Sequence, residues 1–289
     1  MSAWTAADLP SFTGRTVIVT GANSGLGEVT ARELARAGAS VVLAVRNTGK
    51  GDAAAAAMTG DVQVRRLDLQ DLQSVREFAD SIESADVLVN NAGIMAVPYA
   101  QTKDGFESQI GTNHLGHFAL TNLLLPKLTD RVVTVSSIMH LLGYISLGDL
   151  NWKARPYLAW PAYGQSKLAN LLFTSELQRR LSGAGSPLRA LVAHPGYSET
   201  NLQGNTGNRW GTVFWNTATK AIATDADFGA RQTLYAVSAD LPGDSFVGPR
   251  FGMRGPTGLS ARSPLARSTG TARDLWTLSE QLTGTTFPL

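Results

Sequence analysis

The chain has 289 residues, of which 43% are hydrophobic and 17% are charged, a composition typical of a globular protein with a sizeable buried core. Its 25 basic and 23 acidic residues are spread along the chain with a net charge of +2, which argues against a nucleic-acid-binding surface. The absence of cysteine excludes disulfides, thiolate catalysis and thiolate-bound metals.

The start of the chain carries no targeting signal that we recognise. Residues 1–12 lack the basic segment and the following apolar segment of a secretory signal. No later stretch approaches the roughly 20 apolar residues that a membrane-spanning helix needs. We therefore expect a cytoplasmic protein without a membrane span.

Short β-branched runs alternate with longer segments of helical periodicity. The runs are apolar on both faces, as expected for strands of a parallel sheet that helices cover on both sides. The pattern predicts a single doubly wound α/β (Rossmann) domain over residues 1–289, with a mostly parallel sheet of about seven strands. The predicted strands are 16–20, 41–45, 62–67, 87–90, 132–135 and 188–193, and the predicted helices are 25–37, 50–58, 71–83, 105–128, 162–182, 225–238 and 272–282.

Two segments break this alternation, and one tail looks irregular. Residues 139–161 are rich in Gly, Pro and aromatic residues, and residues 197–217 hold four Asn, three Gly and two Trp. Long loops in a compact domain are uncommon unless they cover a binding site, so we expect both to cover the substrate. Residues 249–264, rich in Gly, Pro, Arg and Ser, are expected to be irregular.

A glycine-rich turn follows the first predicted strand and opens the next helix. Its spacing, Gly-x3-Gly-x-Gly, lets backbone N–H groups and the helix N-terminus approach a pyrophosphate. The alternative is a glycine-rich turn that binds nothing. The residues expected at the cofactor are Gly21, Asn23, Ser24, Gly25, Leu26 and Gly27.

The ends of the later strands carry further candidate cofactor contacts. Arg46 and Asn47 end the second strand, where an Arg can pair with the 2′-phosphate of NADP, so we favour NADP over NAD. The alternative is that Arg46 is an ordinary surface residue. Asp68 and Leu69 are expected beside the adenine, and Asn91, Ala92 and Gly93 beside the other ribose.

Tyr163 and Lys167 form a possible proton-transfer pair near the start of a predicted helix. Residues four apart share a helix face, and an adjacent cation favours the phenolate and lowers the pKa of a tyrosine. The alternative is a surface lysine beside a core tyrosine, because Tyr-x3-Lys arises easily by chance.

Taken together, the motifs resemble those of the short-chain dehydrogenase/reductase family. The resemblance runs from Gly14 to about Val247, and the longer runs 102–107, 112–118 and 163–170 resemble the retinol-dehydrogenase-like branch. The motifs in family order are Thr20-Gly21-x3-Gly25-x-Gly27, Asn90-Asn91-Ala92-Gly93, Asn113, Ser136-Ser137, Tyr163-x3-Lys167 and Pro195-Gly196.

The resemblance assigns a role to each matching residue. It implies that Tyr163 exchanges the proton, that Lys167 tunes it and binds the nicotinamide ribose, and that Ser137 polarises the substrate carbonyl. Ser136 is the lesser candidate for that last role. It further implies that Asn113 holds a helix bend and a water of the proton relay. Pro195, Gly196 and Thr200 would contact the nicotinamide amide and the phosphates.

Ser137 and Tyr163 lie 26 residues apart, beyond the shortest spacing in the family, although the retinol-dehydrogenase-like branch has a comparable insertion. The aromatic residues of this insertion either line an apolar pocket or pack against the domain. They are Tyr144, Trp152, Tyr157 and Trp160.

These patterns predict an NADP(H)-dependent oxidoreductase that moves a hydride between nicotinamide and a carbonyl or alcohol. A small hydrophobic carbonyl or alcohol, such as a retinoid-like or steroid-like compound, is the expected substrate. The alternative is a non-catalytic NADP(H)-binding regulatory protein. A complete set of Asn113, Ser137, Tyr163 and Lys167 favours the enzyme, because a sensor has no chemical need for it.

Three further predictions concern metal binding, hydrolase activity and oligomeric state. His114 and His117 have no partner at metal-ligand spacing, so we expect no metal site and assign them packing or capping roles. A serine hydrolase is set aside because the sequence lacks Gly-x-Ser-x-Gly. The predicted helices 116–128 and 167–181 are apolar on more than one face, which predicts a homodimer or higher homo-oligomer. The alternative is that the C-terminal tail covers the extra face.

Overall fold

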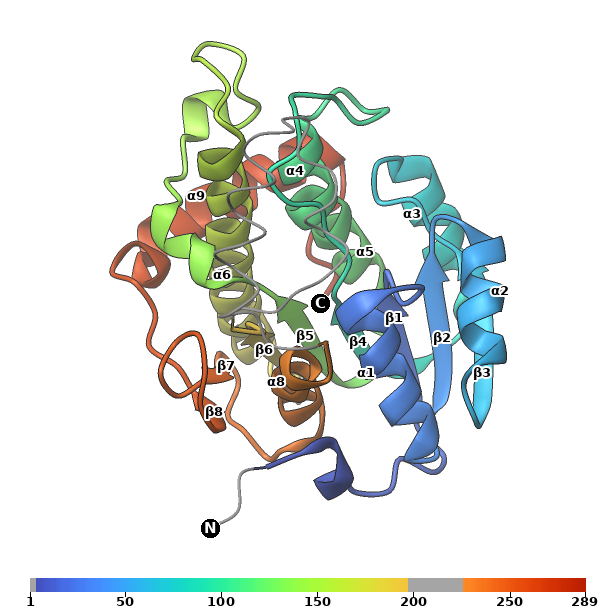
Figure 1. The fold of residues 1–289 in the computed structure, drawn as a ribbon. Helices are drawn as coiled ribbons and strands as arrows, with labels where there is room; N and C mark the ends of the chain where they lie inside the picture. Colours follow the sequence, from blue (N-terminus) through green and yellow to red (C-terminus); the bar gives the residue numbers. More distant parts are fainter. Residues whose placement is uncertain (1–3, 197–225) are drawn as a thin grey trace, which may run out of the picture.

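The computed structural model describes residues 4–196 and 226–289, and its strands form one sheet (Figure 1). The strand order is β3-β2-β1-β4-β5-β6-β7-β8, and every pairing is parallel except that of β7 with β8. The predicted fold class is confirmed, with eight strands in place of about seven. The strands are β1 Thr16–Thr20, β2 Ser40–Val45, β3 Asp61–Arg66, β4 Ala85–Asn90, β5 Leu128–Val135, β6 Arg189–Ala193, β7 Phe246–Pro249 and β8 Thr257–Leu259.

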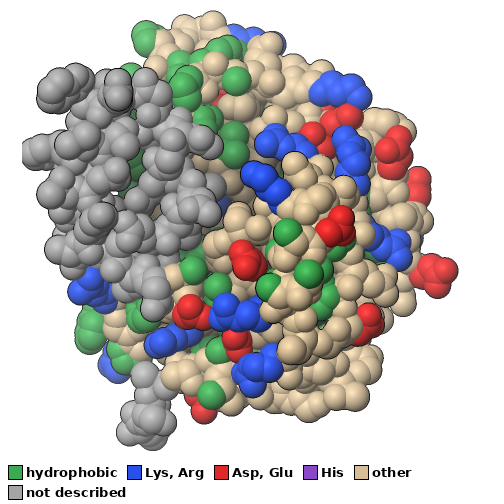
Figure 2. Space-filling view, turned by 45° about the vertical axis from the view of Figure 1, so that its right-hand side comes forward, with side chains coloured by type: hydrophobic (Ala, Val, Ile, Leu, Met, Phe, Trp, Pro, Cys, Tyr) green, Lys and Arg blue, Asp and Glu red, His purple; other side chains and the backbone are tan. Residues whose placement is uncertain are grey.

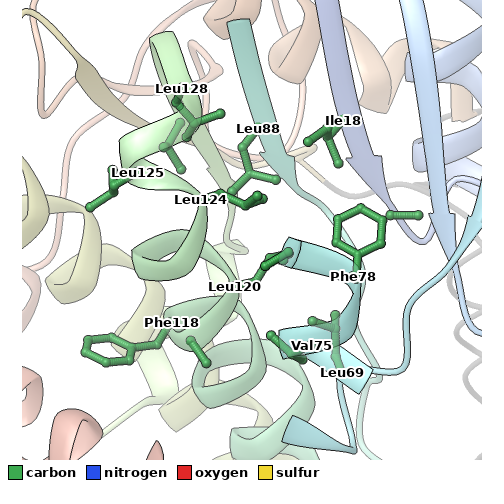
Figure 3. Packing of buried hydrophobic residues seen from close by; sticks show 14 of the residues in the cluster. Ile18, Leu69, Val75, Phe78, Leu88, Phe118, Leu120, Leu124, Leu125 and Leu128 are labelled. Carbon is green, nitrogen blue, oxygen red and sulfur yellow. The ribbon is translucent and has the colours of Figure 1, made fainter. Parts of the chain in front are cut away.

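Helices cover both faces of the sheet because alternate side chains of each strand point to opposite faces. Val17 and Val19 pack in the core under α1 and α8, whereas Ile18 packs with Leu88 in the core under α3 and α5 (Figure 3). The main helices are α1 Gly25–Arg36, α2 Thr48–Ala56, α3 Leu72–Ser81, α5 Gly116–Leu124, α6 Ala159–Gly183, α8 Ala226–Ser238 and α9 Thr269–Thr283.

The helix predicted over 105–128 is wrong in its continuity. The structure divides it into α4 Ser108–Ile110, a π turn Gly111–Leu115, α5, and a 3₁₀ turn Leu125–Lys127. In the π turn the amide of Gly116 bonds to the carbonyl of Gly111, five residues earlier. Pro126 has no amide hydrogen, so the α-helix ends before it and β5 begins at Leu128.

The C-terminal helix α9 covers the extra apolar face of α5 and α6. The ring of Trp276 stacks on Phe173 of α6 with centroids 5.7 Å apart and meets Phe118 of α5 edge-on at 4.8 Å. Trp276 is 1% exposed. The argument for a dimer through this face is therefore removed, because residues of the same chain bury it.

The tail expected to be irregular contains strand structure. Within 249–264, residues of β8 pair antiparallel with β7, as in the match of Val247 with Leu259. The turn between the strands closes with a bond from the Arg250 amide to the Pro256 carbonyl, 2.9 Å long. Gly252, Gly255 and Pro256 of this segment lie in that hairpin turn.

Two surface properties bear on the expected class of protein. Within residues 4–196 and 226–289, no helix combines the length and apolarity that crossing a bilayer requires. On the face drawn in Figure 2, blue basic and red acidic side chains of the described residues lie interspersed. This mixture is consistent with the near-balance of charge along the sequence.

Candidate active site

The residues expected at the cofactor gather at one edge of the sheet. Because β1 to β6 are parallel, their carboxyl ends meet at that edge. Thr200 and the loop 197–217 lie outside the described residues. The candidates that follow a strand within three residues are Gly21 after β1, Arg46 and Asn47 after β2, Asp68 and Leu69 after β3, Asn91, Ala92 and Gly93 after β4, Ser137 after β5, and Pro195 and Gly196 after β6.

The glycine turn after β1 brings backbone against backbone. Gly21 has a φ of +67°, and a Cβ there would lie 2.9 Å from the Cα of Ala92. A Cβ on Gly27 would lie 2.4 Å from the Asn91 amide nitrogen and 2.6 Å from the Gly21 carbonyl oxygen. Only glycine fits these two positions without displacing a neighbour.

Helix α1 begins at Gly25, directly after this turn. Its N-cap residue, Ser24, makes no side-chain cap bond, so the first amide N–H groups of the helix are not capped by that side chain. A helix N-terminus with such groups attracts an anion. The glycine cradle and this helix end together fit the pyrophosphate of a dinucleotide; Asn23 and Leu26 lie in the same segment.

Thr20, the last residue of β1, ties the glycine turn to the end of β4. Its Oγ1 accepts hydrogen bonds from the amides of Asn91 and Ala92, both 2.9 Å long. The Asn91 side chain returns a bond to the Thr20 carbonyl at 2.8 Å. The two expected cofactor segments therefore form one rigid unit.

The ends of β2 and β3 place their candidates in different surroundings. Arg46 is exposed, and Asn47 caps α2 by accepting a bond from the Lys50 amide at 3.0 Å. The Asp68 carboxylate accepts a bond from the Gln70 amide at 3.0 Å. The side chain of Leu69 packs in the core beside Val75 (Figure 3), so packing is the role that the structure shows for it.

Asn113 lies in the π turn and faces the loop after β4. Its Oδ1 accepts from the amide of Ile94, and its Nδ2 donates to the Ile94 carbonyl, each at 2.9 Å. Nδ2 also donates to Ser166 of α6 at 2.8 Å. Asn113 therefore joins the π turn, the β4 loop and the helix that carries Tyr163.

Ser137 and Tyr163 meet in spite of the 26 residues between them. The Ser137 hydroxyl acts on the Tyr163 phenol and opposes the rise in its pKa, and both residues are at most 9% exposed. Ser136 points elsewhere, because its hydroxyl donates to the Lys167 carbonyl at 2.8 Å and is 1% exposed. This arrangement favours Ser137 over Ser136 as the partner of Tyr163.

Lys167 lies beside Tyr163, with its Nζ 5.6 Å from the centre of the phenol ring. The ammonium donates to the Val135 carbonyl at 3.1 Å. Burial lowers the pKa of Lys167 to about 8 and raises the pKa of Tyr163 to about 12, with the Ser137 side chain opposing the latter shift. The sequence predicts that the cation lowers the pKa of the tyrosine, whereas in the structure desolvation raises it and the opposing influence comes from Ser137.

The aromatic residues of the inserted loop lie in different surroundings. Trp152 is 8% exposed and Tyr157 donates to the Val97 carbonyl at 3.0 Å, so these two pack against the domain. Tyr144 is exposed. Trp160 meets Tyr163 edge-on with centroids 6.3 Å apart, which places one aromatic ring next to the candidate proton donor.

Sequence reasoning did not single out three side chains that hold the site together. Thr20 was noted only as the first residue of a motif, Ser166 was not considered, and His117 was assigned to packing or capping. Thr20 and His117 are polar residues within apolar stretches, which is the one signal that the sequence offers for them, and Ser166 carries no such signal. The structure buries all three and gives each a specific partner.

The comparisons with known proteins agree with this geometry. The family model described as short chain dehydrogenase matches residues 15–209. The chain belongs to the short-chain dehydrogenase family. Human "Retinol dehydrogenase 13" is 43% identical over 95% of this chain and 86% of its own length. Mouse "Retinol dehydrogenase 12" is 42% identical over 94% and 87%. The chain is thus a member of the retinol-dehydrogenase-like branch.

Solved structures of this short-chain dehydrogenase fold are also similar. A crystal structure of an uncharacterized protein from Mycobacterium paratuberculosis shares 68% identity and covers 100% of each chain, with a TM-score of 0.90. A Pseudomonas aeruginosa protein solved as an NADP active-site complex is 22% identical over 84% of this chain and 97% of its own, with a TM-score of 0.65. At that identity the likeness concerns the fold alone.

Proposed function

We propose that this dehydrogenase transfers a hydride between NADP(H) and a small hydrophobic carbonyl or alcohol. The buried pair of Ser137 and Tyr163, with Lys167 beside it, carries the proposal. It stands at the sheet edge where the glycine cradle opens. A dinucleotide bound in that cradle would bring the nicotinamide to the same edge.

The site residues then have separate chemical tasks. The bound nicotinamide supplies the hydride in reduction and accepts it in oxidation. Ser137 and Tyr163 donate hydrogen bonds to the substrate oxygen, where negative charge develops as the hydride arrives. Tyr163 gives its proton to this oxygen, and its raised pKa keeps the phenol protonated until that moment.

Lys167 and Asn113 support this proton transfer in the proposal. The Lys167 ammonium faces the Tyr163 ring and would stabilise the phenolate that forms, as well as bind the nicotinamide ribose. Asn113 holds the π turn against the β4 loop and is proposed to take part in the proton relay.

Position and chemistry support the cofactor and the substrate class. Arg46 is exposed at the carboxyl end of β2, where a guanidinium can pair with a 2′-phosphate. The relatives at 42–43% identity are named retinol dehydrogenases, which favours a hydrophobic alcohol or aldehyde.

A non-catalytic nucleotide-binding role is the second candidate. The cytoplasmic location and the homo-oligomer stay predictions, and light scattering would test the latter.

The decisive experiment is an absorbance assay of nicotinamide oxidation and reduction over a panel of aldehydes, ketones and alcohols. Wild type is compared with Tyr163→Phe, which keeps the ring and removes the proton. We expect turnover to fall at least about 100-fold in the variant while nucleotide binding persists. Equal turnover by both proteins contradicts the proposal, and nucleotide binding without any turnover by wild type favours the non-catalytic role.

The cofactor preference needs its own variant. Arg46→Ala is expected to weaken NADPH binding by about tenfold or more and to leave NADH binding nearly unchanged. Arg36→Ala is the matched control, because Arg36 is an exposed arginine at the far end of α1, paired with Glu33 at 2.7 Å. If Arg46→Ala weakens the binding of NADPH and NADH equally, Arg46 does not recognise the 2′-phosphate.

A further inference from the structure

His117 is buried on α5 between the glycine turn and the π turn. It is 1% exposed, and its two ring nitrogens have different partners. Nε2 lies 2.9 Å from the Thr20 hydroxyl, and Nδ1 lies 3.1 Å from the carbonyl oxygen of Asn113. One imidazole thus spans the two segments that the proposed reaction must hold in register.

The partners decide which nitrogen of His117 carries the hydrogen. A carbonyl oxygen only accepts, so Nδ1 must donate to Asn113. Burial lowers the pKa of His117 to about 4, so the ring is neutral at physiological pH and Nε2 is an acceptor. The hydrogen between His117 and Thr20 therefore comes from the threonine.

The hydroxyl of Thr20 is fully used in this arrangement. It has one hydrogen and two lone pairs, and the amides of Asn91 and Ala92 donate to the oxygen at 2.9 Å each. Its hydrogen goes to His117 at 2.9 Å, which is closer than the other acceptor within reach, the Val89 carbonyl at 3.3 Å. A neutral His117 thus orients a hydroxyl that in turn orients two amides.

We infer that His117 is a positioning residue that couples the cofactor-binding turn to Asn113 through one fixed tautomer. This inference rests on the proposed function, since the amides of Asn91 and Ala92 are expected at the nicotinamide ribose. The bond to Thr20 fixes the orientation of the amides that are expected at the nucleotide. The bond to the Asn113 carbonyl fixes the π turn, whose Asn113 side chain bonds to the helix that carries Tyr163 and Lys167. Losing either bond impairs a different step.

Two amide variants separate the two bonds. In His117→Asn, the side-chain NH₂ replaces Nδ1–H and keeps the donor to Asn113 but does not reach Thr20. In His117→Gln, the longer side chain places a carbonyl oxygen near the position of Nε2 and keeps the acceptor for Thr20. We expect His117→Asn to raise KM and Kd for the nucleotide about 5- to 100-fold with kcat little changed.

His117→Gln is expected to show the opposite division: kcat falls about tenfold and the nucleotide Kd stays within about twofold of wild type. His114→Gln is the matched control, because His114 is an equally buried histidine in the adjoining π turn, and its Nε2 lies 2.9 Å from the hydroxyl of Ser279 in α9. It should lower the melting temperature without dividing KM from kcat. If both His117 variants also lower the melting temperature without separate effects on KM and kcat, the inference is overturned.

A measurement on the wild-type protein keeps the test independent of how the variants fold. Nitrogen-15 NMR of the histidine side chains should show His117 as a neutral Nδ1–H tautomer from pH 6 to 8. A protonated ring or an Nε2–H tautomer overturns the inference. Calorimetric titration with NADPH distinguishes failure of the proposed function from failure of the inference. A wild type that binds no dinucleotide contradicts the proposed function. Normal binding by the wild type with an equal Kd in His117→Asn contradicts only the inference.

Discussion

Asn113 bonds both the amide and the carbonyl of Ile94 with a single side chain, each at 2.9 Å. This two-point contact fixes the loop after β4 against the π turn, although the residues lie 19 positions apart in the sequence. Gly93 sits directly under it, since a Cβ there would lie 3.1 Å from the Asn113 oxygen and 3.5 Å from the Lys167 ammonium. The loop and both polar side chains are therefore positioned together.

Asn113→Ala should impair both stability and turnover. It removes three hydrogen bonds and leaves the Ile94 peptide groups unpaired, so we expect a loss of about 2–4 kcal/mol in the free energy of unfolding and at least about a 100-fold fall in kcat. Asn122→Ala in the adjoining helix α5 is the control, because its buried side-chain amide donates to the Phe118 carbonyl at 2.9 Å. Urea unfolding and steady-state kinetics of both variants test this. A normal kcat in Asn113→Ala would disprove the proposed role.

Gly27→Ala should disrupt nucleotide binding more than folding. The new methyl group would collide with the Asn91 amide and the Gly21 carbonyl, and it would break the bond from Asn91 to Thr20. We expect the nucleotide Kd to rise at least about tenfold. Gly270→Ala in α9 is the control, because nothing lies within 4 Å of a Cβ there. An unchanged nucleotide Kd in Gly27→Ala, measured by calorimetry, would contradict the proposal that this turn binds the pyrophosphate.

The depressed pKa of Lys167 predicts a rise in stability with pH. The folded protein releases this proton near pH 8, whereas the unfolded chain holds it until near its ordinary value of 10.5. The unfolded state thus binds more protons between these values, and stability rises with pH in that window. Between pH 7.5 and 9.5 the deprotonation of Lys167 increases the free energy of unfolding by about 1–2 kcal/mol. Above pH 10 the raised pKa of Tyr163 lowers the free energy of unfolding as the pH rises.

Lys167→Met is the comparison for this pH effect, because methionine has no titrating group and a similar length. Urea unfolding of wild type and variant at several pH values should give a difference in free energy that grows as the pH rises. Parallel stability curves over this range would show that Lys167 keeps its proton in the folded protein.

Trp276→Ala should destabilise the whole α5–α6 layer. Its ring fills the space between Phe118 and Phe173, and removing a buried indole leaves a cavity that costs about 3–5 kcal/mol. The exposed neighbour Thr277 provides the control, since Thr277→Ala should stay within about 0.5 kcal/mol of wild type. Thermal and urea unfolding measure both. An equally small effect at Trp276 would mean that α9 does not hold these helices.

The alternation of strands and helices was readable from the sequence because both of its signals are local. A β-branched apolar run such as 41–45 between predicted helices is typical of a strand buried on both faces, and the glycine spacing after β1 indicates a close backbone approach. Predicted strand ends lay within one or two residues for most strands, but β5 began four residues earlier than expected. Neither strand of the β7–β8 hairpin is among the predicted ones, because pairing with neighbouring strands, not composition, makes these short segments strands.

By itself, the sequence determined the fold class, the sheet edge at which the candidate residues gather, and the proposal of Tyr163 and Lys167 as a pair. Only the tertiary structure decided that Ser137 rather than Ser136 meets Tyr163, that α9 covers the apolar face of α5 and α6, and that His117 spans Thr20 and Asn113. Spacing and periodicity describe one element at a time. Hydrogen-bond partners and burial depend on which elements the fold brings together, and desolvation at that meeting point raises the pKa of Tyr163 where the sequence alone suggested a decrease.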